Sequence, residues 1–276
     1  MNKKQENKQI EEKVVTMREL LEAGVHFGHQ TKRWDPRMKK YIYTSRNDIH
    51  VIDLQQSLAL INETYEFVRD TVKKGGRVLF VGTKKQAQEA IAEESKRCGM
   101  YYVNKRWLGG MLTNLETIRK SVKRLKELEE METNGEFELR PTKEASRLKK
   151  ELGKLKYYLD GVSEMKRVPQ IVIIIDTLRE EITVKEARKL KIPIVGVVDT
   201  NCNPQLISHP IPANDDAIRS IKLLVKVFAN AVLEGKGETI EQAGEELSFE
   251  DEMQEAVRRV EKEEEISAKE GIKQEK

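Results

Sequence analysis

The sequence predicts an α/β domain with a parallel sheet, into which an antiparallel helical hairpin is inserted. Short apolar runs alternate with amphipathic helical segments, and strands that are apolar at every position are typical of a parallel sheet covered on both faces. Between residues 113 and 162, two apolar sets with helical spacing are separated by Asn134-Gly135 and Pro141. At 276 residues, the chain is long enough for one such domain with an insertion and tails.

A helix, a strand and a second helix are predicted first. The first helix begins at Leu54 and ends before Gly75-Gly76, because its apolar residues recur by four and three positions in turn, the spacing of one helical face. These residues are Leu54, Leu58, Ile61, Tyr65, Val68 and Val72. The β-branched and aromatic run at 77–82 predicts a strand, and residues 83–97, rich in helix formers, predict a helix that ends before Gly99.

The predicted hairpin contains two helices with one apolar stripe each. The stripes are Leu115, Ile118, Val122, Leu125 and Leu128 in the first helix, and Leu148, Leu152, Leu155, Leu159 and Val162 in the second. Because almost every other position is charged, we interpret the pair as an antiparallel helical hairpin that projects from the α/β body. Two ordinary surface helices are the alternative.

The second half of the chain repeats the strand and helix pattern. Strands are predicted at 171–176 and 192–199, and the helix between them has Thr183 and Glu186 at capping-box spacing. A last helix begins at Asn214 or Asp215 and ends near Gly235. The predicted organisation is a flexible N-terminus at 1–13, an α/β domain at 14–236 interrupted by the hairpin at 113–162, and an acidic tail at 237–276.

Charge is distributed unevenly along the chain. Residues 237–276 carry 14 acidic and 6 basic side chains, whereas the preceding residues carry 44 basic and 33 acidic ones, a net charge of +11. A basic body of this kind favours a polyanionic partner. No apolar run is long enough to span a membrane, the first residues lack a signal-peptide core, and Cys98 and Cys202 have no disulfide or zinc-finger spacing. A cytoplasmic protein is therefore expected.

Candidate catalytic and metal-binding residues are few. His26 and His29 are close enough in sequence to share a divalent ion, zinc or magnesium, with Asp199 or Asp215 as oxygen donors, but local packing of the histidines is the favoured interpretation. The turn Gly82-Thr83-Lys84-Lys85 lies between a strand and a helix, where backbone N–H groups can hold a phosphate, yet neither glycine-rich nucleotide motif is present. No nucleophile elbow occurs, so we expect neither catalysis nor a required cofactor.

Basic residues interleaved with aromatic ones are the stronger signal. Lys and Arg neutralise phosphates, and flat rings stack on exposed bases. The predicted interface with RNA or protein contains Lys32, Arg33, Trp34, Arg37, Lys39, Lys40 and Arg46 in a first strip, Lys105, Arg106 and Trp107 in a second strip, Arg119 and Lys123 on the first hairpin helix, and Lys84 and Lys85 in the strand–helix turn. For the hairpin residues, an ordinary solvated helix surface is an equal alternative.

Several segments together resemble a known family. They are LLEAGVHFGHQTKRWDPRMKKYIY, IHVIDLQQSL, FVGTKKQAQEA, VNKRWLGGMLTN, VVDTN and IPANDDAIRS. In order and spacing they are similar to the bacterial form of the small-subunit ribosomal protein S-two family, over residues 14–235. The resemblance implies a flavodoxin-like three-layer α/β/α domain with a two-helix coiled coil. It also implies a non-catalytic component of the small ribosomal subunit that binds rRNA where head and body meet.

The same resemblance implies further partners. It implies contacts with other small-subunit ribosomal proteins and help in holding the mRNA-binding protein S-one on the subunit. Some members carry a divalent ion, which keeps His26, His29, Asp199 and Asp215 as a candidate group. Two alternatives of other classes stay open. One is a nucleotide-binding enzyme that uses residues 82–85 with the aspartates that end two strands, Asp176 and Asp199, and the other is a free-standing coiled-coil adaptor.

Overall fold

The computed structural model describes residues 14–238. The predicted flexible N-terminus at 1–13 lies outside the described residues, and so does the predicted acidic tail from residue 239 onward. Within the described part of the chain, the helices are all too short or too polar to cross a membrane.

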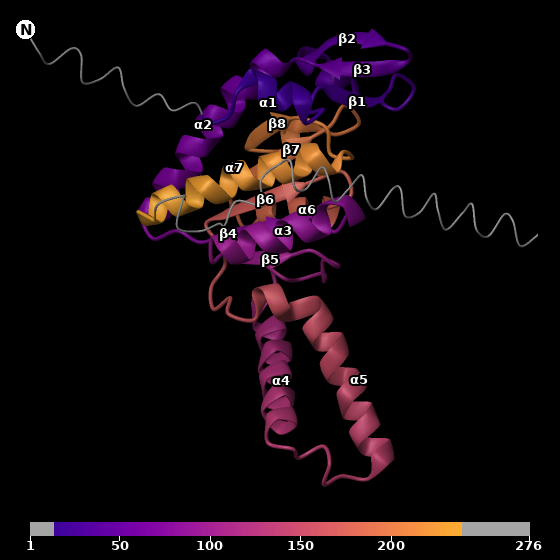
Figure 1. Ribbon diagram of the computed structural model, residues 1–276, viewed down its shortest axis with the longest axis vertical. Coiled ribbons are helices and arrows are strands. Elements are labelled where there is room, and N and C mark those ends of the chain that lie inside the picture. The colour runs from indigo at the N-terminus through magenta and orange to yellow at the C-terminus, as the bar shows by residue number, and fades with distance from the viewer. Residues whose placement is uncertain (1–13, 239–276) are drawn as a thin grey trace, which may run out of the picture. The chain divides into compact units, whose positions relative to one another are not determined.

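A five-stranded parallel sheet forms the centre of the fold (Figure 1). Its strands lie in the order β5 (Tyr101–Val103), β4 (Val78–Val81), β6 (Ile171–Ile175), β7 (Ile194–Val198) and β8 (His209–Pro212). Every residue of β4, β6 and β7 is buried, which explains their continuous apolar sequences and confirms the predicted parallel sheet. The strands β5 and β8 were not predicted, since β5 has only three residues and β8 contains two prolines, which suit only the edge of a sheet.

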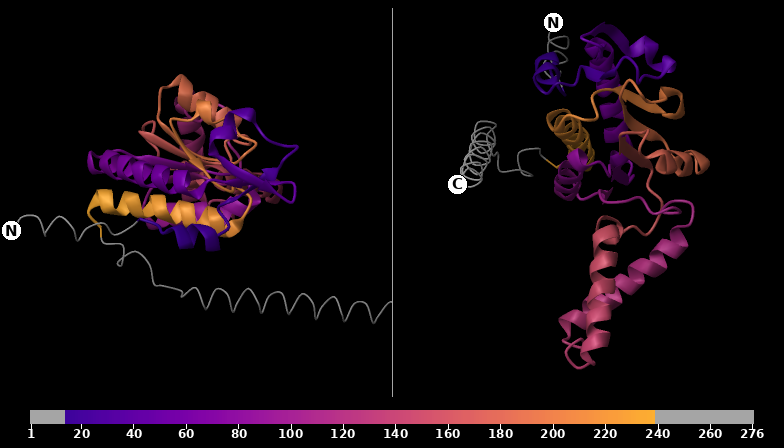
Figure 2. Two further views of the ribbon diagram at one scale, coloured as in Figure 1. Left: turned by 90° about the horizontal axis from the view of Figure 1, so that it is seen from above. Right: turned by 90° about the vertical axis from the view of Figure 1, so that its right-hand side faces the viewer.

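Helices cover both faces of this sheet (Figure 2). The helices α2 (Leu54–Lys73) and α3 (Lys85–Arg97) both contact α7 (Ile218–Lys236), while α6 (Glu181–Lys189) contacts β7. Alternate strand residues point to opposite faces, and Leu79 and Val172 share one core cluster with Val184 of α6. The three-layer α/β prediction is therefore confirmed. The short α1 (Met17–Glu22) contacts α2.

A second, smaller sheet precedes α2. Its strands β1 (Phe27–Gln30), β3 (Ile49–Ile52) and β2 (Ile42–Arg46) are antiparallel and lie in that order. Asn47 and Asp48 join β2 to β3 with φ values of 51° and 59°, the left-handed conformation of a tight two-residue hairpin turn. This sheet was not predicted. Its strands have four or five residues and are largely exposed, so they lack a buried apolar stripe.

The helices α4 (Leu115–Thr133) and α5 (Thr142–Leu159) occupy the predicted insertion and contact each other (Figure 1). The short 3-10 helix η3 (Asp160–Val162) follows α5. Both predicted apolar stripes contribute to the core through Ile118, Leu125, Leu128, Leu148, Leu152 and Leu159. A polar contact also joins the two helices, since Arg124 Nε donates to Glu151 Oε1 at 2.9 Å. The coiled-coil geometry and the domain boundaries stay predictions.

Two helices begin elsewhere than predicted. Thr183 and Glu186 lie inside α6, which already begins at Glu181, so the capping-box interpretation is wrong. The last helix, α7, begins at Ile218. Before it, the side-chain oxygen of Asn214 accepts hydrogen bonds from the backbone N–H groups of Asp216 and Ala217. Asn214 therefore closes a turn ahead of the helix, as Asn side chains commonly do.

Candidate functional site

The first predicted basic strip begins in the loop after β1, continues on the 3-10 helix η2 (Pro36–Tyr41) and ends with Arg46 at the end of β2. Met38 and Tyr41 of η2 are buried together, because residues three positions apart lie on the same side of a 3-10 helix. The other residues of the helix are exposed. All seven predicted residues of the strip are exposed, namely Lys32, Arg33, Trp34, Arg37, Lys39, Lys40 and Arg46.

Neighbouring groups orient two residues of this strip. Asp35 caps η2, and its carboxylate also binds the Arg37 guanidinium through contacts of 2.8 and 2.6 Å. Hydrogen bonds from Arg37 hold the pKa of Asp35 below its usual range. Trp34 keeps 37% of its surface exposed, and its ring lies beside that of His50. Arg37 is thus already paired with an acid, whereas no ion pair within residues 14–238 involves Arg33.

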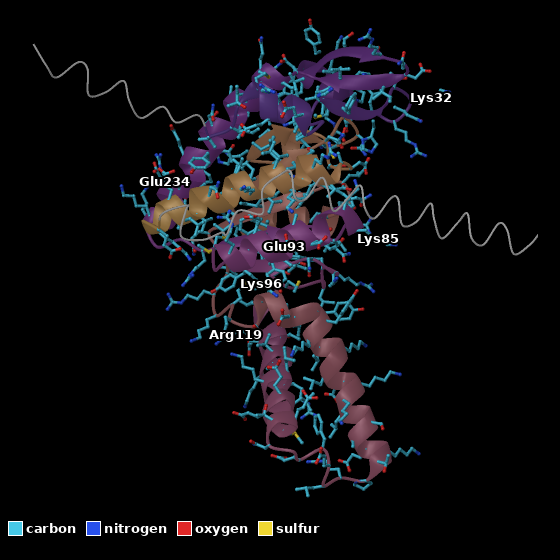
Figure 3. The ribbon with its side chains drawn as sticks, viewed as in Figure 1. Lys32, Lys85, Glu93, Lys96, Arg119 and Glu234 are labelled. Atoms are coloured by element: carbon cyan, nitrogen blue, oxygen red, sulfur yellow. The ribbon has the colours of Figure 1, made fainter. Side chains whose placement is uncertain are left out.

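The other predicted cations do not form one surface. The exposed ones are Lys85, Arg106, Arg119 and Lys123. Lys105 is partly exposed, and its ammonium donates a hydrogen bond to Gln88 Oε1 at 2.9 Å. Figure 3 shows Lys32, Lys85 and Arg119 on three separate parts of the fold. The first strip is therefore the largest predicted group whose members are both clustered in sequence and uniformly exposed.

Glu186 of α6 holds the loop that contains Trp107. Its carboxylate accepts five hydrogen bonds of 2.7–3.1 Å, from the Trp107 indole, the backbone N–H groups of Gly110, Leu112 and Thr113, and the Thr113 hydroxyl. Burial would raise the pKa of Glu186, but these hydrogen bonds outweigh burial and hold the pKa below its usual range. Trp107 is 7% exposed, so its ring belongs to the core and not to the predicted interface.

Lys84 is buried as well, at the carboxyl ends of the parallel strands. Its ammonium lies 2.8 Å from Asp215 Oδ1, 2.6 Å from Asp216 Oδ1 and 3.3 Å from Asp176 Oδ2. Burial would lower the pKa of Lys84, but the hydrogen bonds to Asp215 and Asp216 outweigh burial and raise the pKa. Lys84 therefore stays charged and neutralises carboxylates inside the fold. This position removes it from the predicted interface with RNA or protein.

Lys84 and its aspartates lie where the alternative function, a nucleotide-binding enzyme, would place its ligand. In open parallel sheets, ligands bind beyond the carboxyl ends of the strands, at the point where the strand order reverses. In this sheet, that point lies between β4 and β6. Here Lys84 and Asp176 are paired across that point. The Thr83 backbone N–H and hydroxyl are both bound to the Glu180 carboxylate, at 3.0 and 2.6 Å. Acidic side chains thus occupy the Thr83 donors and the Lys84 ammonium in this turn.

Three of the four candidate metal ligands lie together beside Lys84. His29 Nδ1 lies 3.1 Å from Asp199 Oδ2, and ligand atoms of His29, Asp199 and Asp215 all lie within 4.8 Å of one another. Burial and the carboxylates of Asp176 and Asp199 raise the pKa of Asp215 to about 7. The buried Oδ2 atom of Asp215 has no hydrogen-bond partner in the described part of the chain. One imidazole with two carboxylates is a ligand set that fits a divalent ion such as zinc.

The segment before the basic strip anchors the smaller sheet to the larger one. Val25 is fully buried, and the backbone N–H of His29 donates to the Thr200 hydroxyl at 2.9 Å. A Cβ atom on Gly28 would lie 2.6 Å from the Thr200 side chain, so glycine is required for this close approach. His26 lies in the turn before β1 and is not part of the metal group.

Comparisons with known proteins agree with the resemblance seen in the sequence. A family model described as ribosomal protein S2 matches residues 20–235. Small ribosomal subunit protein uS2 of Treponema pallidum subsp. pallidum is 60% identical over 225 residues, which are 82% of this chain and 77% of the relative. The protein of the same name from the Nichols strain of Treponema pallidum matches with the same identity and coverage. The matched residues include both sheets and the inserted helices α4 and α5.

Proposed function

Because the chain belongs to the ribosomal protein S2 family, we propose that it is a structural, non-catalytic component of the bacterial small ribosomal subunit in the cytoplasm. It binds rRNA near the junction of head and body, together with neighbouring ribosomal proteins. It also supports the docking of the mRNA-binding protein S-one. The observation that carries the proposal is the exposed basic strip at residues 32–46.

The chemistry of the strip suits RNA phosphates. Phosphate contacts supply much of the affinity of nucleic-acid binding and position the protein without reading sequence. Lys32, Arg33 and Lys39 form no ion pair among the described residues, so they are free to neutralise phosphates. Arg37 shares its charge with Asp35, which fixes its guanidinium and weakens its attraction for an anion. Lys40 and Arg46 also lack an ion pair among the described residues, so the cations of the strip other than Arg37 are the residues on which binding depends most.

Sedimentation of a cell lysate tests the proposal directly. The protein is expected to cosediment with small subunits, and to leave them as the salt concentration rises, because phosphate contacts weaken with salt. A protein found mainly in the soluble fraction at physiological salt would contradict the proposal. That result would favour the free-standing adaptor.

Replacement of Lys32, Arg33 and Lys39 with Ala is expected to weaken incorporation into small subunits that lack the protein. The slope of log affinity against log salt should become less steep by roughly two, since each lost phosphate contact contributes about 0.7–0.9. The matched control replaces Lys73, Lys74 and Lys189, which are exposed elsewhere and change the net charge equally. Equal salt slopes for both triple variants would remove the strip from the RNA-binding surface.

A divalent ion bound by His29, Asp199 and Asp215 is a second proposal, supported by the unpartnered Oδ2 atom of Asp215. Such an ion would tie the smaller sheet, through His29, to the carboxyl ends of the larger one. Zinc at 100 times its dissociation constant is expected to stabilise the protein by about 2.7 kcal/mol. Calorimetry with and without zinc measures this effect. His29→Gln should abolish it and His26→Gln should keep it; the same shift in both variants would exclude this ligand set.

A further inference from the structure

A cleft of about 420 Å³ lies between α3, β5 and the C-terminal half of α5. This volume lies within the range of pockets that hold small organic groups. Three lysines and three tyrosines are among the residues that line it: Lys96, Lys105, Lys156, Tyr102, Tyr157 and Tyr158. Figure 3 shows Lys96 on α3, from which it lines this cleft. The functions assigned above do not use this cleft.

The charge of the lining favours an anion. Asp160 is the one acidic residue among those that line the cleft, and its carboxylate already accepts a hydrogen bond from the Tyr102 hydroxyl at 2.8 Å. The Lys105 ammonium lies 5.4 Å from the centre of the Tyr157 ring. Three ammonium groups thus border the cleft, against the paired Asp160 and against Glu129, whose Oε1 lies 3.8 Å from the Lys156 ammonium. A ligand that enters the cleft meets a net positive charge.

The aromatic lining offers an exposed flat surface. Tyr157 is 56% exposed, so much of its ring is open to contact with another flat group. Its ring is fixed at its edge by Tyr158, with the two ring centres 5.0 Å apart. A ring held in this way loses little freedom when a second flat group stacks on it.

Gly153 gives an independent indication of a ligand. It lies in the interior of α5 and lines the cleft. Glycine at such a position destabilises a helix by about 1 kcal/mol relative to alanine. Nothing lies within 4 Å of the place where its Cβ would be, so no contact within the described residues requires glycine here. The missing side chain leaves one wall of the cleft open for close approach of a ligand.

We infer that this cleft binds an unpaired nucleotide of RNA, with the base stacked on Tyr157 and the phosphate held by Lys96 and Lys156. A nucleotide combines a flat face with an anion, which matches the rings and ammonium groups of the lining. An acidic peptide would use the lysines alone. The inference rests on the proposed function, because the RNA that it requires is that of the small subunit.

Competitive incorporation tests the cleft. Small subunits that lack the protein are mixed with equal amounts of unmodified protein and an isotope-labelled variant, and their ratio in the assembled subunits is measured by mass spectrometry. Tyr157→Ala is expected to lower incorporation about tenfold, the usual effect of losing one stacked base. Tyr157→Trp should retain it, because the flat ring is kept. Lys156→Ala should weaken incorporation more than Lys154→Ala, an exposed neighbour outside the lining.

Gly153→Leu separates binding from folding. Leucine is a good helix former and would project into open space, so thermal stability should be kept or raised while the cleft is filled. Incorporation should nevertheless fall about as far as for Tyr157→Ala. Ultraviolet irradiation of assembled subunits should give a nucleotide adduct on a peptide that contains Tyr157 or Tyr102.

Distinct results would overturn the inference. Normal incorporation of both Tyr157→Ala and Gly153→Leu would show that nothing essential occupies the cleft. Crosslinks from Lys156 to a neighbouring ribosomal protein, without a nucleotide adduct, would show that the occupant is protein and not RNA. Failure of the proposed function is recognised separately, because the unmodified protein would then not enter small subunits at all.

Discussion

Replacement of Glu186 with Ala is expected to destabilise the protein by about 3–5 kcal/mol. The Glu186 carboxylate accepts five hydrogen bonds, and its removal leaves donors of Trp107, Gly110, Leu112 and Thr113 without an acceptor. Urea unfolding followed by circular dichroism measures the loss. Glu181→Ala is the control on the same helix, since Glu181 is exposed and paired only with Lys185. This control should change stability by less than about 0.5 kcal/mol.

The pH dependence of stability gives a second test of Glu186. Its pKa is held below the usual value in the folded protein, so its charge stabilises the fold above the unfolded pKa of about 4.3. This contribution is lost as the pH falls through the folded pKa. Glu186→Gln should therefore be less stable than the unmodified protein at neutral pH. In acid, the unfolding free energies of the two proteins should become equal. Stability curves that stay parallel from pH 7 to pH 3 would contradict this assignment.

Replacement of Lys84 with Met is expected to destabilise the protein by about 3–5 kcal/mol, because it leaves buried carboxylates without their cation. Asp215 is fully buried and bonded to Lys84, so it should be affected most. The neighbouring Lys85 is exposed, and Lys85→Met is expected to have little effect. Unfolding in urea with a chelator present measures both variants without interference from bound metal.

A double-mutant cycle shows whether the pair acts as proposed. Lys84→Met combined with Asp215→Asn removes both charges, so the double variant should be more stable than the sum of the single losses predicts, by more than about 1 kcal/mol. Additive losses would mean that Lys84 stabilises the fold through packing of its side chain alone. In that case, the charge of Lys84 would contribute nothing through its contact with Asp215.

The regular elements were predictable because their signals are local. The spacing of Leu54, Ile61 and Val68 encodes one face of α2, and the continuous apolar runs encode strands buried on both faces. The smaller sheet and the edge strands β5 and β8 were missed. Short, largely exposed strands carry little hydrophobic pattern, and their pairing depends on segments elsewhere in the chain.

The candidate site was only partly predictable. Exposure of the first basic strip was expected, and for Arg37, Lys39 and Lys40 it is explained by η2, which buries Met38 and Tyr41. Three of the four proposed metal ligands do come together, although His29 and Asp215 are far apart in sequence. Glu186 was misread as a local cap, because its true partners lie 73–79 positions earlier in the chain. Partners at such separations leave no signal in local spacing.

The sequence by itself determined the α/β class, the parallel sheet, the inserted helices and the family, because these depend on local periodicity and on segments whose order is specific. Only the tertiary structure decided which charged and aromatic residues face solvent. Lys84 and Lys85 are adjacent and chemically identical, yet one is buried among aspartates and the other is exposed. Side-chain chemistry states what a residue can bind, whereas burial depends on contacts with distant segments that form only when the chain folds.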